Sequence, residues 1–317
     1  MGNERTVKYS TSMVKCFKQC RKKYFLEYVK NLKPIQTPAA LQLGTLYHKG
    51  IELLLNGMEL PNIKLELEAA QRNACLDANA DYDPILNGIA FEMVKVFYRE
   101  SGYASWGIDH VEKAFEVPTA YGKRLIGKID VIANIHGNKF VVDHKTTSRW
   151  GEDGGEYLHS LLWDEQSTNY LYAYEQIYGE YAKGMLYVII EKPTFKLSKA
   201  TPLEKRKYTK TGALYASQRE EDETPEEYLA RVAEWYREKP RLHIHLQHRT
   251  PAELEKQVHD LNLVFKDMAD CEKSETYYRN PAACSILDCP YRSKCLEDTA
   301  DTDCLFVEKK ARSEELL

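Results

Sequence analysis

Two apolar segments of the chain each carry a carboxylate within a run that should otherwise be buried. Residues 124–135 are rich in Ile, Val and Leu, and residues 139–145 form a second such run. The intervening His-Gly-Asn at residues 136–138 is typical of a tight turn, so the two runs are expected to pair as a β-hairpin. The pairing places Asp130 and Asp143 on neighbouring strands. Any fold of this chain must accommodate both charges, because unpaired buried charges are strongly disfavoured.

The second strand predicts which side chains share a face. Residues two apart point to the same side of a strand, so Asp143 and Lys145 should project together while His144 points away. Asp130, Asp143 and the backbone carbonyl of His144 would supply oxygen ligands of the kind that magnesium and manganese prefer. The Lys145 ammonium would orient a water molecule or stabilise developing negative charge. The alternative is a structural Asp143–Lys145 pair on an edge strand, because so short a triplet also occurs by chance.

These residues resemble a known family. Asp130, followed by Asp143-His144-Lys145, is similar to the PD-(D/E)XK nuclease superfamily, and the surrounding GKID and VVDHKTT segments resemble its RecB-type branch. The resemblance implies a restriction-endonuclease-like α/β core, in which helices flank a mixed central sheet. It also implies metal-dependent hydrolysis of DNA, as an exonuclease acting on DNA ends in recombination, repair, phage replication or CRISPR-related processing.

Two further matches to the branch follow in the expected order. His48, in the segment LGTLYH, resembles a metal-binding histidine and lies on a helix predicted at residues 39–55. By itself, a histidine on a helix is more often a structural group than a ligand. Gln166 and Tyr170 fit a Q-x-x-x-Y element, and the resemblance implies that they position the nucleic-acid strand and the catalytic Lys145. An ordinary turn of an aromatic-rich helix is the alternative for this pair.

The cysteines indicate a second metal site. The chain has eight, and Cys284, Cys289, Cys295 and Cys304 lie within 21 residues of one another. The N-terminus is polar and no run of about 18 apolar residues occurs, so neither a signal peptide nor a membrane span is expected. We therefore expect a cytoplasmic protein, encoded by a cell, a phage or a mobile element. Because thiols stay reduced there, the cluster predicts metal ligands rather than disulfides.

The resemblance extends to these cysteines. RecB-type nucleases that carry an iron–sulfur cluster take one cysteine from the first helix and three from the C-terminal end. The implied ligands of a [4Fe–4S] cluster are Cys20, Cys284, Cys289 and Cys295. The match is imperfect, because Arg21 follows Cys20 where a proline is common and the spacing from Cys284 to Cys289 is longer than in relatives. Cys16 is an alternative to Cys20, and a structural zinc site closed by Cys304 is the rival to the cluster.

Charge and size restrict the partners. A chain of 317 residues with 43% hydrophobic content can bury a sizeable core, so one nuclease domain with extensions is expected. The net charge of −4 argues against a generally basic nucleic-acid binder. Residues 15–33, however, hold seven Lys or Arg against one Glu and suit phosphate contacts, although a solvated helix face explains them equally well. The expected ligand is DNA, single-stranded or with free ends, and a helicase, recombinase or integrase is the expected kind of protein partner.

The pattern of apolar residues divides the chain into four parts. We expect a helical N-terminal part with the first cluster cysteine at residues 1–110, the nuclease core at 111–191, a polar insertion at 192–250, and a C-terminal helix with the cysteine-rich tail at 251–317. The predicted helices are 12–29, 39–55, 64–80, 85–101, 163–181, 224–237 and 251–271. The predicted strands are 111–117, 124–135, 139–145, 184–191 and 242–248.

A second hypothesis comes from a different functional class. The chain could be a catalytically inactive DNA-end-binding subunit whose cysteines hold a structural iron–sulfur or zinc cluster. The presence of Asp130, Asp143 and Lys145 argues against this hypothesis, because a degenerate site commonly loses at least one such residue. Dependence of DNA cleavage on a divalent ion would distinguish the two.

Overall fold

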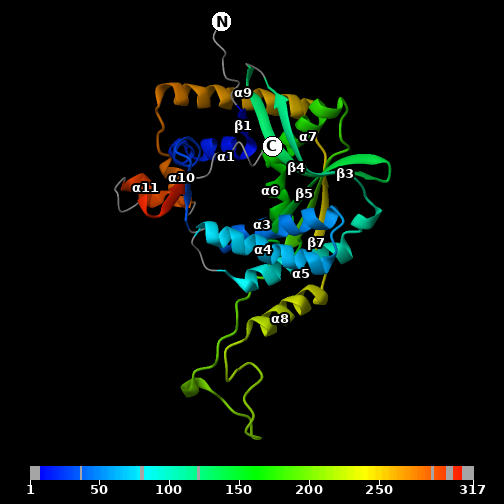
Figure 1. Ribbon diagram of the computed structural model, residues 1–317, viewed down its shortest axis with the longest axis vertical. Coiled ribbons are helices and arrows are strands. Elements are labelled where there is room, and N and C mark those ends of the chain that lie inside the picture. Colours follow the sequence, from blue (N-terminus) through cyan, green and yellow to red (C-terminus); the bar gives the residue numbers. More distant parts are fainter. Residues whose placement is uncertain are drawn as a thin grey trace.

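A mixed six-stranded sheet lies at the centre of the described part of the protein (Figure 1). The computed structural model describes residues 8–35, 38–78, 82–119, 122–286, 289–297 and 303–308. The strand order is β1-β4-β5-β6-β7, and β3 pairs with β4. Two pairs, β1–β4 and β5–β6, are parallel and the others are antiparallel. The strands are β1 (Lys8–Ser10), β3 (Gly107–Pro118), β4 (Arg124–Ile135), β5 (Asn138–Thr147), β6 (Met185–Glu191) and β7 (Leu242–Gln247).

Helices cover both faces of the sheet. One buried cluster joins α1, α7 and α9 to sheet residues such as Val141 and Ile189, and a second joins α3, α4, α5 and α8 to Val142 and Val188. Alternate residues of β5 therefore serve opposite cores, as strand geometry requires. The helices are α1 (Thr11–Gln19), α2 (Arg21–Tyr24), α3 (Ala39–Leu55), α4 (Leu60–Ala78), α5 (Pro84–Glu100), α6 (Gly155–Leu162), α7 (Glu165–Tyr178), α8 (Pro225–Glu238), α9 (Pro251–Ser274), α10 (Pro281–Ile286) and α11 (Arg292–Leu296).

Local sequence explains several of these elements. In α3 the buried residues Leu43, Tyr47, Ile51 and Leu54 recur at helical spacing on the face toward the core. Burying a side chain of this size contributes roughly 1.5–3 kcal/mol. The predicted capping box at the start of α8 is present, because the side chain of Thr224 and that of Glu227 each accept from the other's backbone N–H.

The predicted fold class is confirmed, and three local predictions were wrong. The helix predicted at residues 12–29 is interrupted at Cys20, which is extended (φ −162°, ψ 117°) between α1 and α2. Helix α6 was missed because its start is hidden in a glycine-rich segment, where Gly154 is the N-cap with a φ of +73°. Strand β1 was missed because its three residues pair with β4, far away in sequence. The predicted helix end at residues 79–80 lies outside the described residues.

The described C-terminal segment packs against the N-terminal helices (Figure 1). Strand β2 (Leu32–Pro34) pairs with β8 (Phe306–Glu308), and Asn280 Nδ2 donates to the Gln19 carbonyl at 2.8 Å. Leu26 and Tyr291 meet in a small buried cluster of their own. These protein contacts join the two ends of the described chain; residues 309–317 of the predicted tail lie outside the described residues. No helix in the described ranges is long and apolar enough to cross a membrane.

Candidate active site

Strands β4 and β5 separate where the two predicted carboxylates lie. Their ladder ends at the pair Val131–Val142, and Asp130 and Asp143 are the next residues on each strand. Beyond this point β5 continues alongside β6, so that Lys145 pairs with Ile189. The His144 N–H donates a 3.0 Å hydrogen bond to Asp130 Oδ2. The Asp130 side chain thus satisfies a backbone donor at the place where the β4–β5 ladder has ended.

Asp130 is also part of a compact group of candidate metal ligands. His48 Nδ1 on α3 lies 3.3 Å from Asp130 Oδ2, and one ligand atom from each of His48, Glu112 and Asp130 lies within 4.8 Å of the others. Glu112 faces Asp130 across the β3–β4 ladder, between the pairs Val111–Val131 and Lys113–Ile129. Two carboxylates and one imidazole suit a magnesium or manganese ion.

Glu112 was not identified from the sequence. Its φ of +51° lies in the left-handed region, which costs a non-glycine residue roughly 1–2 kcal/mol and is sustained only by the surrounding structure. The usable signal was the hairpin register, because pairing Pro118 with Arg124 places Glu112 opposite Asp130. Lys128 Nζ lies 3.4 Å from Glu112 Oε2 and partly balances the added charge.

Asp143, Lys145, Gln166 and Tyr170 form a chain of polar contacts on the other side of β5. Lys145 Nζ lies 2.9 Å from Asp143 Oδ2 and donates to Gln166 Oε1 at 2.7 Å. Gln166 Nε2 in turn donates to the Tyr170 hydroxyl at 2.9 Å. Asp164, the N-cap of α7, lies 3.7 Å from Lys145 Nζ and was also missed by the sequence analysis. The structure therefore brings Asp143, Gln166 and Tyr170 together around Lys145.

Burial and neighbouring charges give the two aspartates different properties. Burial raises the pKa of Asp143 to about 6; the Lys145 ammonium opposes this shift and Asp130 adds to it. Burial also acts to raise the pKa of Asp130, but His48 and His144 outweigh it and hold that pKa well below its usual range. Burial lowers the pKa of Lys145, yet Asp143 and Asp164 reverse the shift and leave it well above its usual value. Lys145 is therefore a cation at neutral pH, and Asp130 is an anion.

The two histidines of the site face the α3–α5 side of the sheet. The buried His144 ring packs on Phe97 of α5 and Tyr47 of α3, at centroid distances of 5.3 and 6.3 Å, so it points away from Lys145 as the strand alternation predicted. Burial lowers the pKa of His144, which favours the neutral ring. Burial also acts to lower the pKa of His48, but Asp130 outweighs it and the net shift is upward.

Asp143 lies outside the compact ligand group, although the sequence analysis placed it there. Within the described ranges, the group of metal-ligating atoms within 4.8 Å of one another comprises His48, Glu112 and Asp130. Asp143 is nevertheless near enough for both charges to act on its pKa, which Asp130 raises and His48 lowers. Ligation by the His144 carbonyl stays a prediction.

A polar cavity of about 440 Å³ adjoins the site. It reaches Gln166 and Tyr170 on one side and Lys128, the partner of Glu112, on the other. Lys15 supplies a second cation from α1. The remaining lining residues are Ser10, Thr11, Ser12, Ile126, Gly127 and Asp164.

The four cysteines predicted as cluster ligands line a second cavity, of about 400 Å³, between the N-terminal helices and the tail. They are Cys20, Cys284, Cys289 and Cys295. Lys23, Arg279 and Arg292 also line this cavity. Lys23 acts to lower the pKa of the Cys289 thiol, but burial outweighs it and the net shift is upward. Cys16 does not line it: its sulfur lies 3.8 Å from Glu27 Oε2, and burial together with Glu27 raises its pKa to about 12. Cys304 is exposed and is likewise not among the lining residues.

The spacing of the sulfur atoms is wide. Across the described ranges, no three cysteine sulfurs lie within 4.8 Å of one another. Tetrahedral zinc with Zn–S bonds of about 2.3 Å would bring its sulfurs to about 3.8 Å from one another. In this arrangement of the side chains the sulfurs therefore do not form a tetrahedral zinc site.

Comparisons with known proteins found a matching family model and similar solved structures. The model of the PD-(D/E)XK nuclease superfamily matches residues 8–296. The solved structure of a candidate exonuclease from Eubacterium rectale is 13% identical, has a TM-score of 0.49, and is matched over 96% of this chain and 90% of that chain. The structure of the protein SSO0001 is 16% identical, with a TM-score of 0.26 and coverage of 74% and 76%. No curated protein matches the sequence.

Proposed function

This chain belongs to the PD-(D/E)XK nuclease superfamily, and we propose that it is a magnesium- or manganese-dependent deoxyribonuclease that degrades DNA from its ends. One observation carries the proposal. The ligand group of His48, Glu112 and Asp130 lies beside the Asp143–Lys145 ion pair, at the point where β4 and β5 separate. Acidic ligands next to a partly buried ammonium suit metal-assisted hydrolysis of a phosphodiester.

The donor set fits a divalent ion. His48, Glu112 and Asp130 would hold it, and Asp143 and the His144 carbonyl are the further ligands that the sequence suggests. Asp130 is already ionised, because His48 and His144 hold its pKa low against the effect of burial. When bound, the ion would supply Lewis acidity at the phosphate and lower the pKa of a water molecule.

Lys145 would act as a cation rather than as a base. Its pKa is raised by Asp143 and Asp164 against the effect of burial, so the amine keeps its proton at neutral pH. An ammonium in this position would orient the attacking water or stabilise the charge that develops on the phosphate oxygens. Gln166 and Tyr170 hold the amine in place through two successive hydrogen bonds, which supports their proposed role as positioning residues.

The cavity beside the site supports a polynucleotide substrate. Lys15 and Lys128 provide two cations, and Ser10, Thr11 and Ser12 provide hydroxyl groups, next to the residues that hold Lys145. Such a lining suits phosphates that flank the scissile one. The preference for DNA ends rests on the likeness of the GKID and VVDHKTT segments to RecB-type nucleases.

We also propose that the cysteine-lined cavity holds a [4Fe–4S] cluster bound by four residues. The ligands would be Cys20, Cys284, Cys289 and Cys295. A cavity of about 400 Å³ and widely spaced sulfurs favour a cluster over zinc, because irons and sulfides would lie between the thiolates. The high pKa of Cys16 disfavours it as the alternative ligand, since ligation requires a thiolate.

The test is a cleavage assay with end-labelled linear and closed circular DNA, each single- and double-stranded, in manganese, magnesium or a chelator. We expect metal-dependent loss of linear DNA only, and no loss with Asp130→Asn. Asp260→Asn, an exposed residue on α9, is the matched control and should cleave like the wild type. Binding without cleavage in every metal would instead favour a catalytically inactive DNA-end-binding subunit.

A further inference from the structure

An arm between β6 and α8 extends away from the body of the protein (Figure 1). We define it as residues 196–223. The arm consists of an outgoing and a returning segment, which we call its legs. Tyr208 on the first leg forms a β-bridge with Leu214 on the second. Gln218 on the second leg accepts from the Lys207 N–H at 2.7 Å and donates to the Lys205 carbonyl at 3.0 Å. Arg206 donates to the carbonyls of Thr201 and Glu220. These contacts give the arm a defined shape.

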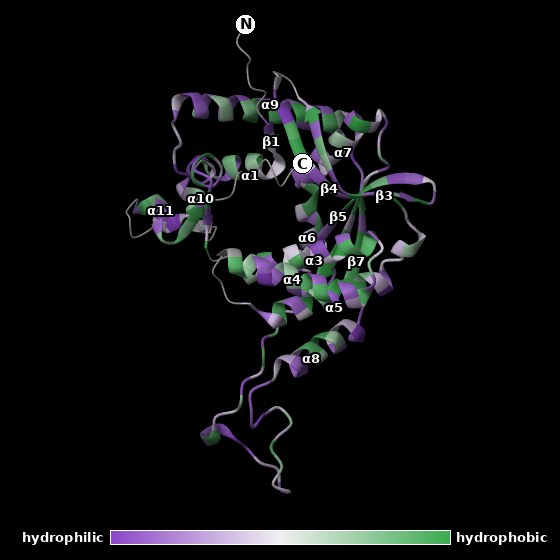
Figure 2. Ribbon diagram, viewed as in Figure 1, coloured by the Kyte–Doolittle hydropathy of each residue, from purple (hydrophilic) through white to green (hydrophobic). Residues whose placement is uncertain are grey.

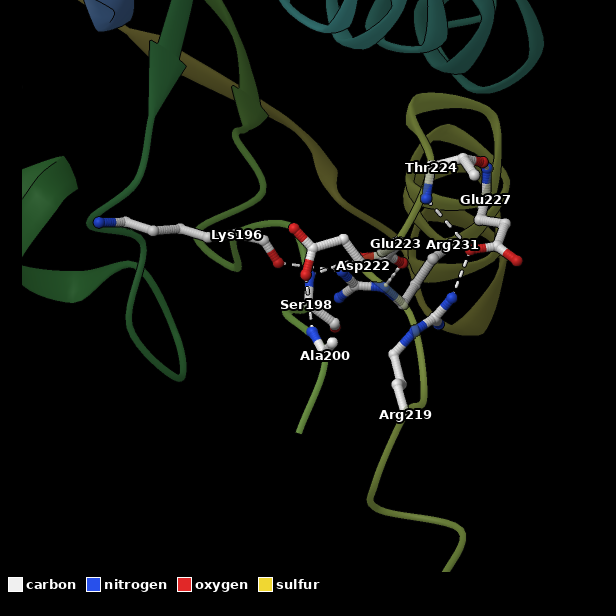
Figure 3. A network of polar contacts seen from close by, with 9 residues as sticks. All are labelled: Lys196, Ser198, Ala200, Arg219, Asp222, Glu223, Thr224, Glu227 and Arg231. Atoms are coloured by element: carbon white, nitrogen blue, oxygen red, sulfur yellow. Dashed lines mark hydrogen bonds and ion pairs between the residues drawn. The ribbon is translucent and has the colours of Figure 1, made fainter. Parts of the chain in front are cut away.

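The base of the arm is held by a charged network (Figure 3). The Glu223 carboxylate, whose side chain is 2% exposed, accepts from Arg231 Nε at 2.8 Å and from Arg231 Nη2 at 2.6 Å. It also accepts from the Ser198 N–H at 2.7 Å, so one carboxylate joins both legs to α8. Asp222 accepts from the Ala200 N–H at 2.8 Å. Bidentate pairing of this kind fixes geometry as well as adding energy.

The far part of the arm carries three exposed cations without acidic partners, whereas Lys199 and Arg219 pair with Asp222 and Glu227. Residues 199–219 contain six Lys or Arg and one acidic residue, Glu204, in a chain whose net charge is −4. Lys205, Lys207 and Lys210 are exposed and form no ion pair with the described residues (Figure 2 shows hydrophilic residues on both legs). A concentration of unpaired cations on a projecting element favours a polyanion as its ligand.

Two exposed tyrosines lie among these cations. Tyr208 is 52% exposed and Tyr215 is 48% exposed. The Tyr215 N–H donates to the Lys207 carbonyl at 3.1 Å, which brings the two tyrosines onto neighbouring positions of the paired legs. Aromatic rings interleaved with cations are typical of surfaces that bind single-stranded nucleic acid, because unpaired bases stack on the rings while phosphates contact the cations.

We propose that the arm binds single-stranded DNA, with Lys205, Lys207 and Lys210 contacting phosphates and Tyr208 and Tyr215 stacking on bases. This inference rests on the proposed nuclease function and extends it by naming the ligand of a second surface. The arm leaves the sheet at the end of β6, where Glu191 pairs with Thr147, two residues beyond Lys145 on β5. A DNA strand bound by the arm would therefore be held near the end of the sheet where β5, the strand that carries Lys145, also ends.

The test measures binding of a labelled 30-nucleotide strand by fluorescence anisotropy, with a chelator present so that nothing is cleaved. We expect the triple variant Lys205→Ala, Lys207→Ala, Lys210→Ala to bind about tenfold more weakly at 0.1 M salt. Its plot of log affinity against log salt should be shallower by about 2, since each lost phosphate contact removes about 0.7 from the slope. The matched control replaces Lys256, Lys266 and Lys273 on α9, at the opposite end of the molecule (Figure 1).

A second variant tests the stacking contacts. Tyr208→Ala with Tyr215→Ala should weaken binding of the single strand about fivefold or more and leave binding of a duplex of equal length unchanged. An equal loss on duplex and single strand would overturn the single-strand assignment. Arm variants with the wild-type melting temperature that bind no differently from the α9 control would overturn the inference as a whole, which is also the result expected if the arm serves an acidic protein partner.

The two proposals fail separately. The binding assay requires no cleavage, so a wild-type protein without nuclease activity still allows the arm to be tested. A protein that cleaves DNA normally, but whose arm variants bind like the wild type, overturns only the inference about the arm.

Discussion

Asp130 Oδ2 accepts a 3.0 Å hydrogen bond from the backbone N–H of His144, across the gap that opens between β4 and β5. The same oxygen lies 3.3 Å from His48 Nδ1. The Asp130 carboxylate therefore accepts from a backbone N–H where the β4–β5 ladder ends, and it also contributes to the proposed metal site. Structural and catalytic roles of Asp130 can be separated, because only the second requires a negative charge.

Two substitutions at Asp130 should separate these roles. Asp130→Asn keeps an oxygen that can accept from His144, whereas Asp130→Ala leaves that buried N–H without a partner, at a cost of about 1–3 kcal/mol. Both lose the charged ligand, so cleavage should fall on the order of 10³-fold in each. Urea unfolding and DNA cleavage measure the two effects. Equal stability of the two variants would contradict the structural role, and cleavage at the wild-type rate by either would contradict the catalytic one.

The loss of activity on substitution should become smaller, step by step, from Lys145 through Gln166 to Tyr170. Lys145→Ala removes the ammonium and should lower kcat by about 10²–10³-fold. Gln166→Ala only loosens it, and we expect a loss of about 10–100-fold, as for groups that orient a functional residue. Tyr170→Phe keeps the ring that packs on Phe115 and should cost only a fewfold loss. The measurement is kcat and KM for each variant; a Tyr170→Phe defect as large as that of Lys145→Ala would disprove the stepwise order.

Divalent-ion affinity should rise with pH through about 6. Burial raises the pKa of Asp143 to about 6, although Lys145 opposes the shift, so this carboxyl is largely protonated at pH 5 and unable to ligate. Below that pKa the affinity should increase about tenfold per pH unit, because one proton leaves for each ion bound. Manganese titrations by calorimetry from pH 5 to 8 provide the test.

Two variants should show which residues cause this pH dependence of ion affinity. Asp143→Asn should lack the step near pH 6, while His48→Gln should lack a second step at higher pH, since the pKa of His48 is raised. The ion-free protein should lose stability as pH rises from about 4 to 6, because the unfolded chain favours the ionised Asp143. An affinity for manganese that is flat between pH 5 and 7 would argue against Asp143 as a ligand.

Substitutions of Cys20 and Cys16 should have different effects on the proposed cluster. Protein purified without oxygen should be brown and contain about four irons per chain, as a [4Fe–4S] cluster requires. Cys20→Ser should lose the colour and the iron, whereas Cys16→Ser should retain both, because Cys16 lies outside the lining of the cavity. Metal analysis and visible absorption are the measurements. Colourless protein with one zinc per chain would support the rival site.

Much of the framework was predictable from local pattern. The helix at residues 39–55 and the strand at residues 124–135 have the predicted bounds, because a helical stripe of apolar residues and a β-rich run ending at a His-Gly turn are strong local signals. The opposite orientations of His144 and Lys145 follow from strand alternation alone. Elements stabilised by distant partners were harder to predict from the sequence. Strand β1, for example, pairs with β4 across more than 110 residues.

The candidate site shows the same division. Asp130, Asp143 and Lys145 were recognisable from sequence because their charges interrupt apolar strands. Glu112 was not, because its approach to Asp130 depends on the register between two strands and on a left-handed backbone at one residue. The opposite pKa shifts of Asp143 and Asp130 likewise depend on tertiary contacts: burial raises the pKa of Asp143, whereas His48 and His144 outweigh burial at Asp130.

The sequence by itself determined the alternation of the strands, the helical stripe and cap signals, and the identity of the groups able to bind a metal. These properties depend on residues within a few positions of one another. The tertiary structure alone decided where β4 and β5 separate, which cysteines share a cavity and whether the polar insertion is an ordered arm. Each of these depends on contacts between residues far apart in the chain, and on the burial those contacts create.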